Sequence, residues 1–321
     1  MDKKTENIKN NLMNQVTKLY KETNRGSFKT RARYEEATER FCNFLAKEFR
    51  LQKFKNVKEK HVVAYVEHMK TEGKAPSTIQ TDLSAIRFSH SLSGSRNILP
   101  DNSKLNLEQR EYNKIDRAWT QKEIDQAKQY AQAMDRPDVY HAIDLSEKFG
   151  LRIEGAATVT VNHLKEALET KELYAKEKGG LERYIPVKTV EQENTIKNLL
   201  NYAQKNGKTG SDKAISSSVK HGVKQQIKSI QNWVTNNRDK FQDNSIRGKE
   251  NVQEFRKTAE ENGLKMRSEN LSFHGLRYKY AQDRFETLKD QGFSDKVAKF
   301  TVSRELGHFR PDITNVYLAR K

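Results

Sequence analysis

Apolar residues recur every three or four positions along most of the chain, which is the spacing of one face of an α-helix. Over residues 1–24 the pattern is weak and predicts an N-terminal arm or a first helix. Over residues 25–95 it is strong and predicts a compact all-helical unit. Its predicted helices start at Ser27, at Lys58 and at Pro76, where Ser77 and Gln80 are placed as a capping box.

The helical pattern breaks over residues 96–118, where proline, asparagine and charged residues replace the apolar repeat. We interpret this stretch as an interdomain linker. Residues 119–321 then form a second predicted unit, which opens with a capping box of Thr120 and Glu123. Further helices are predicted over residues 138–149, 189–204, 219–241 and 252–264.

One short sheet interrupts the helices of the second unit. Residues that favour β-structure occur at 159–161 and at 173–174, and residues 182–187 are predicted to return as a strand after a glycine turn. Pro186 cannot donate to a ladder, which indicates an edge strand. The predicted fold class is therefore mainly α with a small antiparallel β-sheet.

The net charge of the chain indicates the kind of partner it binds. The 321 residues carry a formal net charge of +17, which favours a polyanion such as nucleic acid. The single cysteine, Cys42, cannot form an internal disulfide and lies in an apolar helical pattern, as expected for a core residue in a reducing compartment. No stretch approaches the roughly 20 apolar residues of a membrane span, and the N-terminus lacks a signal-peptide core, so we expect a cytoplasmic protein.

Several polar residues that could form one pocket lie near the C-terminus. His274 and Arg277 are three positions apart, so they share one face of a helix. His308 and Tyr317 are nine apart and would lie on opposite sides of one continuous helix. Pro311 predicts a break between them, because proline lacks an N–H and clashes with the preceding turn. With that break, all four side chains can converge on one pocket.

These residues, together with two upstream segments, resemble the tyrosine recombinases, or phage-type integrases. His274-Gly275-Leu276-Arg277 matches the His-x-x-Arg box of that family, and Leu306-Gly307-His308 is followed after nine residues by Tyr317 at the nucleophile position. Phe149-Gly150-Leu151-Arg152-Ile153 resembles the first-arginine box, and residues 178–187 resemble the β-hairpin with the catalytic lysine. The resemblance implies a helical core-binding domain, partly matched over residues 75–83, and a tyrosine-recombinase-type catalytic domain.

The resemblance also implies a role for each site residue. Tyr317 would attack the phosphodiester, and Arg152 and Arg277 would hold the phosphate oxygens through forked, permanently charged donors. Lys178 would protonate the leaving 5′-oxygen, His274 would handle a proton near Tyr317, and His308 would hydrogen-bond the phosphate. Free phenols have a pKa near 10, so the nucleophile must lose its proton as it attacks.

The function implied is site-specific DNA recombination, integrating or excising a mobile element through a 3′-phosphotyrosyl intermediate, without cofactor or metal. The partners implied are double-stranded DNA, further copies of the chain in a tetramer on DNA, and an accessory directionality factor, in the bacterial cytoplasm or nucleoid. A type IB-like DNA topoisomerase and a catalytically silent DNA-binding protein of the same fold are the alternatives.

Some assignments stay open from sequence alone. Lys176 lies near the same turn as Lys178, and Tyr278 and Tyr280 are alternative phenols that we expect to pack or to contact DNA. His61 and His68 are seven apart but have no third ligand nearby, so we expect core or surface roles and no metal site.

Three features depart from the family pattern. The acidic residue usual three positions after the first arginine is replaced by Gly155, next to Glu154, so we expect Arg152 to be oriented differently. Residues 188–273 are longer than in compact members, which predicts an insertion. Only residues 318–321 follow Tyr317, so we expect either a truncated C-terminus or a different coupling between subunits.

Overall fold

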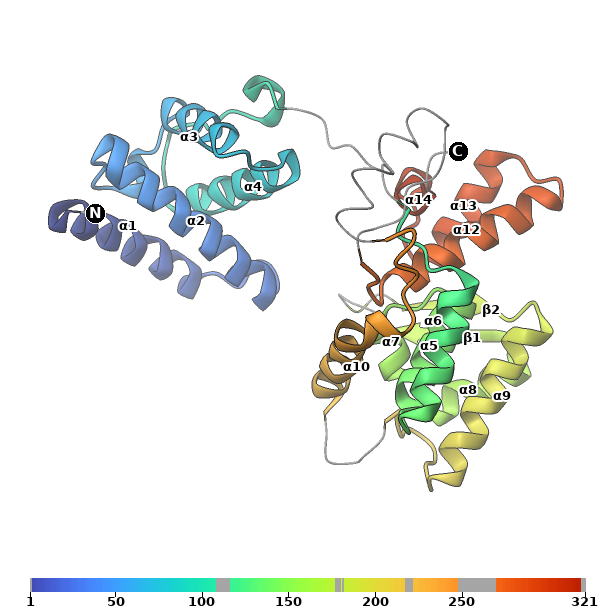
Figure 1. The fold of residues 1–321 in the computed structure, drawn as a ribbon. Helices are drawn as coiled ribbons and strands as arrows, with labels where there is room; N and C mark the ends of the chain where they lie inside the picture. Colours follow the sequence, from blue (N-terminus) through green and yellow to red (C-terminus); the bar gives the residue numbers. More distant parts are fainter. Residues whose placement is uncertain are drawn as a thin grey trace. The chain divides into compact units, whose positions relative to one another are not determined.

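The protein consists of two units, Met1–Glu111 and Tyr112–Lys321, drawn as a ribbon in Figure 1. The computed structural model describes residues 2–107, 116–176, 180, 182–216, 222–247 and 270–318, and for Ile313 the backbone only. The predicted helix at 252–264 and Lys178 lie outside these residues. We describe each unit by itself.

The N-terminal unit is all-helical in its described residues. Helix α2 is its centre, because α1, α3 and α4 all pack against it. The elements are α1 (Lys3–Glu22), α2 (Phe28–Phe49), η1 (Phe54–Asn56), α3 (Glu59–Thr71), α4 (Pro76–Leu92) and η2 (Asn102–Leu105).

The N-terminal residues, whose helical periodicity is weak, form a complete helix, α1. Ile8, Leu12, Val16 and Tyr20 recur at helical spacing in α1 and are buried in the core of this unit. Cys42 is also buried in that core, as predicted. These contacts make α1 part of the helical unit.

The predicted capping box at the start of α4 is wrong. Helix α4 begins at Pro76, with Ala75 at the N-cap position and no side-chain cap, so Ser77 already lies inside the helix. Proline explains this start, because its fixed φ suits the first helical position and its missing N–H needs no partner there. Pro100 and Leu105, within the stretch predicted as a linker, are buried in this unit.

The C-terminal unit is mainly helical and has one hairpin. Helix α6 lies at its centre and contacts α5, α7, α9, α10 and α12. The elements are α5 (Gln121–Ala133), α6 (Pro137–Phe149), α7 (Ile153–Thr158), α8 (Val161–Thr170), β1 (Glu172–Lys176), β2 (Glu182–Pro186), α9 (Val190–Lys205), α10 (Val223–Asn237), η4 (Arg238–Lys240), α12 (Gly275–Asp290), α13 (Asp295–Glu305) and α14 (Pro311–Tyr317).

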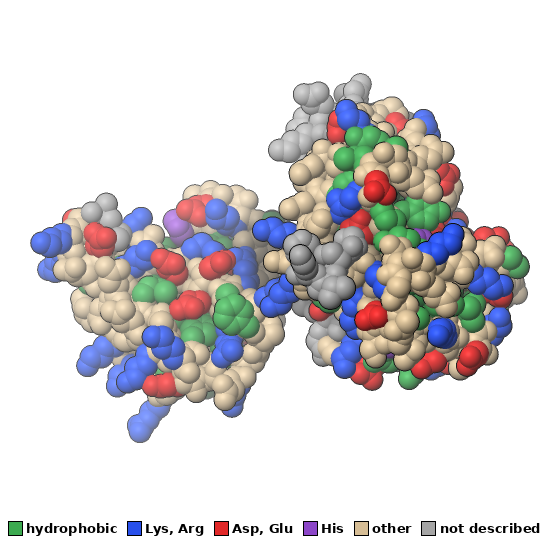
Figure 2. Space-filling model, turned by 90° about the horizontal axis from the view of Figure 1, so that it is seen from below, with side chains coloured by type: hydrophobic (Ala, Val, Ile, Leu, Met, Phe, Trp, Pro, Cys, Tyr) green, Lys and Arg blue, Asp and Glu red, His purple; other side chains and the backbone are tan. Residues whose placement is uncertain are grey.

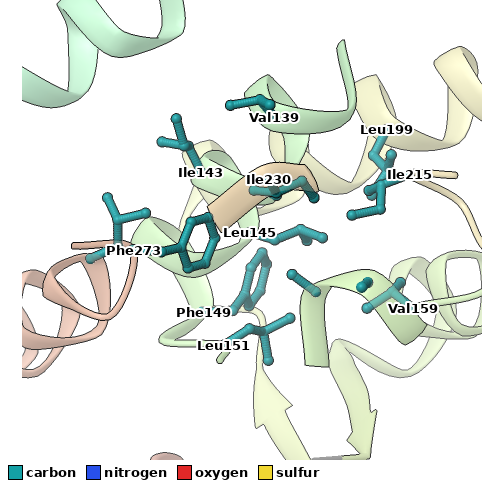
Figure 3. Packing of buried hydrophobic residues seen from close by; sticks show 14 of the residues in the cluster. Val139, Ile143, Leu145, Phe149, Leu151, Val159, Leu199, Ile215, Ile230 and Phe273 are labelled. Atoms are coloured by element: carbon teal, nitrogen blue, oxygen red, sulfur yellow. The ribbon is translucent and has the colours of Figure 1, made fainter. Parts of the chain in front are cut away.

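The core of this unit is formed around α6 (Figure 3). Phe149 at the end of α6 packs with Leu151, and Leu199 of α9 and Ile230 of α10 belong to the same cluster. The described parts of the predicted insertion at residues 188–273 therefore contribute residues to the core. The capping box of Thr120 and Glu123 is confirmed at the start of α5.

The predicted antiparallel hairpin is confirmed. Strand β1 pairs with β2 in the register Glu172 with Pro186 and Lys176 with Glu182. The β-favouring residues at 159–161 do not form a strand of this sheet. Thr160 instead caps α8 by accepting a hydrogen bond from the His163 N–H, because a threonine hydroxyl satisfies a free donor of the first turn.

These elements confirm the predicted fold class, mainly α with a small antiparallel sheet. No helix among the described residues is long and apolar enough to cross a membrane.

Candidate active site

The start of α12 is fixed against the first residues of the C-terminal unit. Trp119 donates a hydrogen bond from its indole nitrogen to the Ser272 carbonyl at 2.8 Å. A Cβ at Gly275 would lie 2.5 Å from the Arg117 carbonyl oxygen, so only glycine allows this close approach. His274 occupies the N-cap position of α12, and Arg277 follows in its first turn.

Arg277 is buried where the ends of two other helices meet. Its guanidinium donates to the carbonyl of Gly150, at the end of α6, at 2.5 Å, and to the carbonyl of Leu306, at the end of α13. Carbonyls at a helix C-terminus have no partner within the helix, so they are available to accept these bonds. The two bonds fix the plane of the Arg277 guanidinium.

The predicted break between His308 and Tyr317 is present. Helix α13 ends at Glu305, Gly307 adopts a φ of 73°, and α14 starts at Pro311. The turn is held by Ser303, whose hydroxyl donates to the Arg310 carbonyl at 2.8 Å and accepts from the Arg310 N–H at 3.0 Å.

Four of the predicted site residues converge through His308. Its Nε2 lies 3.1 Å from the Tyr317 hydroxyl and 3.4 Å from a terminal nitrogen of both Arg152 and Arg277. A guanidinium can only donate, so these neighbours favour the tautomer in which Nε2 accepts and Nδ1 carries the proton. In that tautomer the imidazole can accept the proton of Tyr317.

The ring of Tyr317 is buried among side chains of α12. Its centroid lies 4.8 Å from that of Tyr278 and 6.0 Å from that of His274, and the Arg277 guanidinium carbon lies 5.7 Å from it. The Tyr280 hydroxyl, in contrast, donates to Glu305 at 2.9 Å, and burial raises the pKa of Tyr280 well above that of a free phenol. Of these phenols, Tyr317 is therefore the one whose hydroxyl contacts a histidine beside two guanidiniums.

Comparison with known proteins shows which fold holds these residues. Residues 9–99 match the family model for the N-terminal domain of phage integrases. The whole chain is similar to a lambda integrase dimer bound to a core site, with a TM-score of 0.60 and 14% identity over 95% of this chain and 94% of that one. A search of curated proteins finds no match.

Two further solved structures are similar. XerH site-specific recombinase, bound to a palindromic difH substrate in a post-cleavage complex, has a TM-score of 0.59 and 16% identity over 96% of this chain and 81% of that one. The Tn1549 transposon integrase in complex with transposon right end DNA has a TM-score of 0.55 and 15% identity over 96% of this chain and 95% of that one. The chain has the tyrosine-recombinase fold. The resemblance predicted from the motifs is confirmed.

Of the two candidate lysines in this tyrosine-recombinase fold, the structure places one. Lys176, at the end of β1, is exposed and pairs with Glu182 at 2.9 Å, and this hydrogen-bonded ion pair raises the pKa of Lys176. Its amine is therefore engaged by a carboxylate on the neighbouring strand, while Lys178 lies outside the described residues.

Glu305 and Arg183 are buried charged residues of the site that the sequence reasoning did not select. The Glu305 carboxylate accepts from Tyr280 at 2.9 Å, from Arg284 at 3.0 Å and from Lys188 at 3.1 Å. Both residues lie at positions that the apolar spacing places on the inward face. Glu305 is three positions after buried Val302 on a helix, and Arg183 is two positions before buried Ile185 on a strand. A charge at an inward position is a signal that could have identified them.

The histidines outside the site have structural contacts. His61 accepts the Lys58 N–H at 2.9 Å and so caps α3, while His68 lies 3.4 Å from Glu72. Across the described residues, no group of three or more His, Cys, Asp or Glu is arranged to hold a metal ion. Glu154, the displaced carboxylate next to Gly155, is exposed and lines an open cleft with Lys176.

Proposed function

We propose that the protein is a site-specific DNA recombinase that breaks and rejoins DNA through a 3′-phosphotyrosyl intermediate, as an integrase of a mobile element. The observation that carries this proposal is the contact of His308 Nε2 with the Tyr317 hydroxyl and with the guanidinium groups of Arg152 and Arg277. A nucleophile, a proton acceptor and two fixed cations beside one another are what phosphodiester cleavage by a phenol needs.

The proposed reaction conserves the number of phosphoester bonds. The Tyr317 oxygen attacks phosphorus while its proton passes to an imidazole, and the bond from phosphorus to the 5′-oxygen breaks. Arg152 and Arg277 stabilise the negative charge on the non-bridging oxygens, an effect of roughly 3–4 kcal/mol for each well-placed donor. Lys178 protonates the leaving 5′-oxygen. A 5′-hydroxyl of the exchanging strand then gives its proton to Lys178 and attacks the phosphotyrosine, and Tyr317 leaves with the proton held by the imidazole. Rejoining therefore needs no nucleotide cofactor.

The structure adds one detail to the proton transfer. The sequence resemblance assigned the proton near Tyr317 to His274, whereas the Tyr317 hydroxyl contacts His308 at 3.1 Å in the DNA-free chain. The centroid of the His274 ring lies 6.0 Å from that of Tyr317. We therefore propose that His308 accepts the proton first and that His274 supports the site from the start of α12.

We propose double-stranded DNA as the substrate and a tetramer of the chain on DNA as the assembly. The net charge of +17 supports this, and Lys and Arg side chains project from the N-terminal unit in Figure 2. One similar structure is a lambda integrase tetramer bound to a Holliday junction. Residues 25–95 would be the core DNA-binding domain, residues 96–118 the linker and residues 119–321 the catalytic domain. We also propose that the protein acts in the bacterial cytoplasm and that an accessory directionality factor binds the complex.

Tyr317→Phe tests the nucleophile directly. A pool of nicked duplexes of random sequence is incubated with the protein, and DNA that stays attached in detergent is counted and its ends are sequenced. We expect Tyr317→Phe to lose the adduct entirely. Tyr278→Phe, which removes a hydroxyl from the ring that packs at a tilt against Tyr317, is the matched control and should keep the adduct.

The same assay separates the alternatives. An adduct that persists in Tyr317→Phe, or that disappears in Tyr278→Phe alone, would refute the assignment of the nucleophile. Adducts without sequence preference, with relaxation of supercoiled plasmid and no recombinant product, would favour a topoisomerase. A wild-type protein that binds DNA but forms no adduct would favour the silent DNA-binding protein.

A further inference from the structure

Arg183 is a buried arginine between the hairpin and the active site. It lies on β2, faces inward together with Ile185, and is 4% exposed. Burying a guanidinium is unfavourable unless its donors are satisfied, so its contacts indicate what it is there for.

Two of those contacts join the ends of the helices that carry the site. One terminal nitrogen of Arg183 donates to the Glu305 carbonyl, at the last residue of α13. The other donates at 3.3 Å to the carbonyl of Gly150, at the end of α6. Arg183 therefore spans α6 and α13 from the side of the sheet.

Arg277 binds at the same two places. Its guanidinium donates to the Gly150 carbonyl and to the carbonyl of Leu306, the residue directly after Glu305. The Gly150 oxygen thus accepts from both arginines, and each arginine holds one of two consecutive carbonyls at the end of α13. A shift of the Glu305 or Leu306 carbonyl would therefore move Arg277. It would also move His308, which follows Leu306 by two residues.

The Glu305 side chain also holds the end of α13, through contacts with other elements. Its carboxylate accepts from Tyr280 and Arg284 of α12 and from Lys188 after β2, while its main-chain carbonyl accepts from Arg183. One residue therefore connects α12, α13 and the hairpin immediately before the Leu306-Gly307-His308 turn.

We propose that Arg183 is a positioning residue of the strand-cleavage reaction, which holds the Gly150 and Glu305 carbonyls so that the guanidinium of Arg277 meets the scissile phosphate. The inference rests on the proposed function. Forked donation is essential to this role, because one guanidinium serves two carbonyls of different helices and an ammonium cannot span them in the same geometry. Misplacement of a catalytic group by about 1 Å can lower a rate roughly a hundredfold.

The test compares two substrates that differ in charge at the reacting phosphate. Both are duplexes of the sequence mapped with the wild-type protein, one with an ordinary scissile phosphate and one with a methylphosphonate, which lacks one anionic oxygen. The neutral substrate gains little from Arg277, so it should depend little on what positions Arg277. We expect Arg183→Gln to slow cleavage of the phosphate about a hundredfold and cleavage of the methylphosphonate less than about tenfold.

Two further variants make the result specific. Arg183→Lys keeps the charge without the fork and should lose about as much as Arg183→Gln, and it serves as the test if the glutamine variant does not fold. Arg136→Gln is the matched control, because Arg136 forms a two-bond ion pair with Asp138 at the opposite end of α6. It should not change the ratio of the two rates.

The double variant of Arg183→Gln with Arg277→Gln should be no slower than Arg277→Gln alone, since residues that act as a unit are not additive. Equal losses on both substrates would mean that Arg183 only stabilises the fold, and this would overturn the proposal. Wild-type cleavage by Arg183→Lys would do the same. Failure of the proposed function itself is distinguishable, because the wild-type protein would then form no adduct with either substrate.

Discussion

Gly150 offers a quantitative test of how the site is assembled. It ends α6 with a φ of 61°, in the left-handed region, and its carbonyl accepts from Arg277 and Arg183. A Cβ added there would lie 2.5 Å from Cδ1 of Tyr280 and 3.0 Å from Cδ2 of Leu306. A separation of 2.5 Å is too short for two carbons, so Tyr280 or the helix end has to move.

The expected destabilisation has two parts. An alanine in the left-handed region costs about 1–2 kcal/mol, partly offset by about 0.4–1 kcal/mol from the lower entropy of the unfolded chain. Crowding a packed site adds about 1–3 kcal/mol. Gly207 is the matched control, because its φ is 72° and no atom lies within 4 Å of a Cβ built there. Gly207→Ala should therefore be destabilised only by the cost of placing alanine in the left-handed region.

The difference between the two variants therefore isolates the crowding. We expect Gly150→Ala to be less stable than Gly207→Ala by about 1–3 kcal/mol, or about 2–12 °C in Tm for a unit of this size. Urea unfolding followed by tryptophan fluorescence measures it, since both tryptophans, Trp119 and Trp233, lie in the C-terminal unit. Equal stability of the two variants would refute the close packing of Gly150 against Tyr280. Gly150→Ala should also slow DNA cleavage, whereas Gly207→Ala should not.

Two other predictions follow from the charged groups. Lys178→Ala should abolish cleavage of ordinary DNA, and replacing the bridging 5′-oxygen by sulfur should restore cleavage, because a thiolate leaves without a proton. Lys176→Ala should cleave ordinary DNA normally. If sulfur instead rescues a cleavage defect of Lys176→Ala, the general acid is Lys176. Burial lowers the pKa of His141 to about 4 from an ordinary 6.5, so folding favours its neutral form. The stabilisation is complete above about pH 6.5 and is lost as the pH falls towards 4, up to about 3 kcal/mol. His141→Gln should flatten the fall in the free energy of unfolding over that window in urea titrations at each pH, and an unchanged slope would contradict the burial argument.

Most of the helices could be predicted from the sequence because their signals are local. Apolar spacing located α2, α3, α6 and α9, and Thr120 with Glu123 marked the start of α5, as the structure confirms. Local signals failed where two of them competed. Pro76 set the start of α4 ahead of Ser77, and Thr160 capped a helix in a stretch that favoured a strand.

The sequence also determined which residue types the site contains. The boxes at His274 and His308 and the break at Pro311 predicted a site with two histidines, an arginine and a tyrosine, and the chain brings Arg277, His308 and Tyr317 together with Arg152. The tertiary structure alone decided how they are held. The partners of Arg277 are main-chain carbonyls of Gly150 and Leu306, and those of Arg183 are the carbonyls of Gly150 and Glu305. Every residue has a carbonyl, so no side-chain pattern shows which carbonyls will meet an arginine 29 to 127 positions away in the chain. That depends on where the packing of α6, α12 and α13 brings the helix ends.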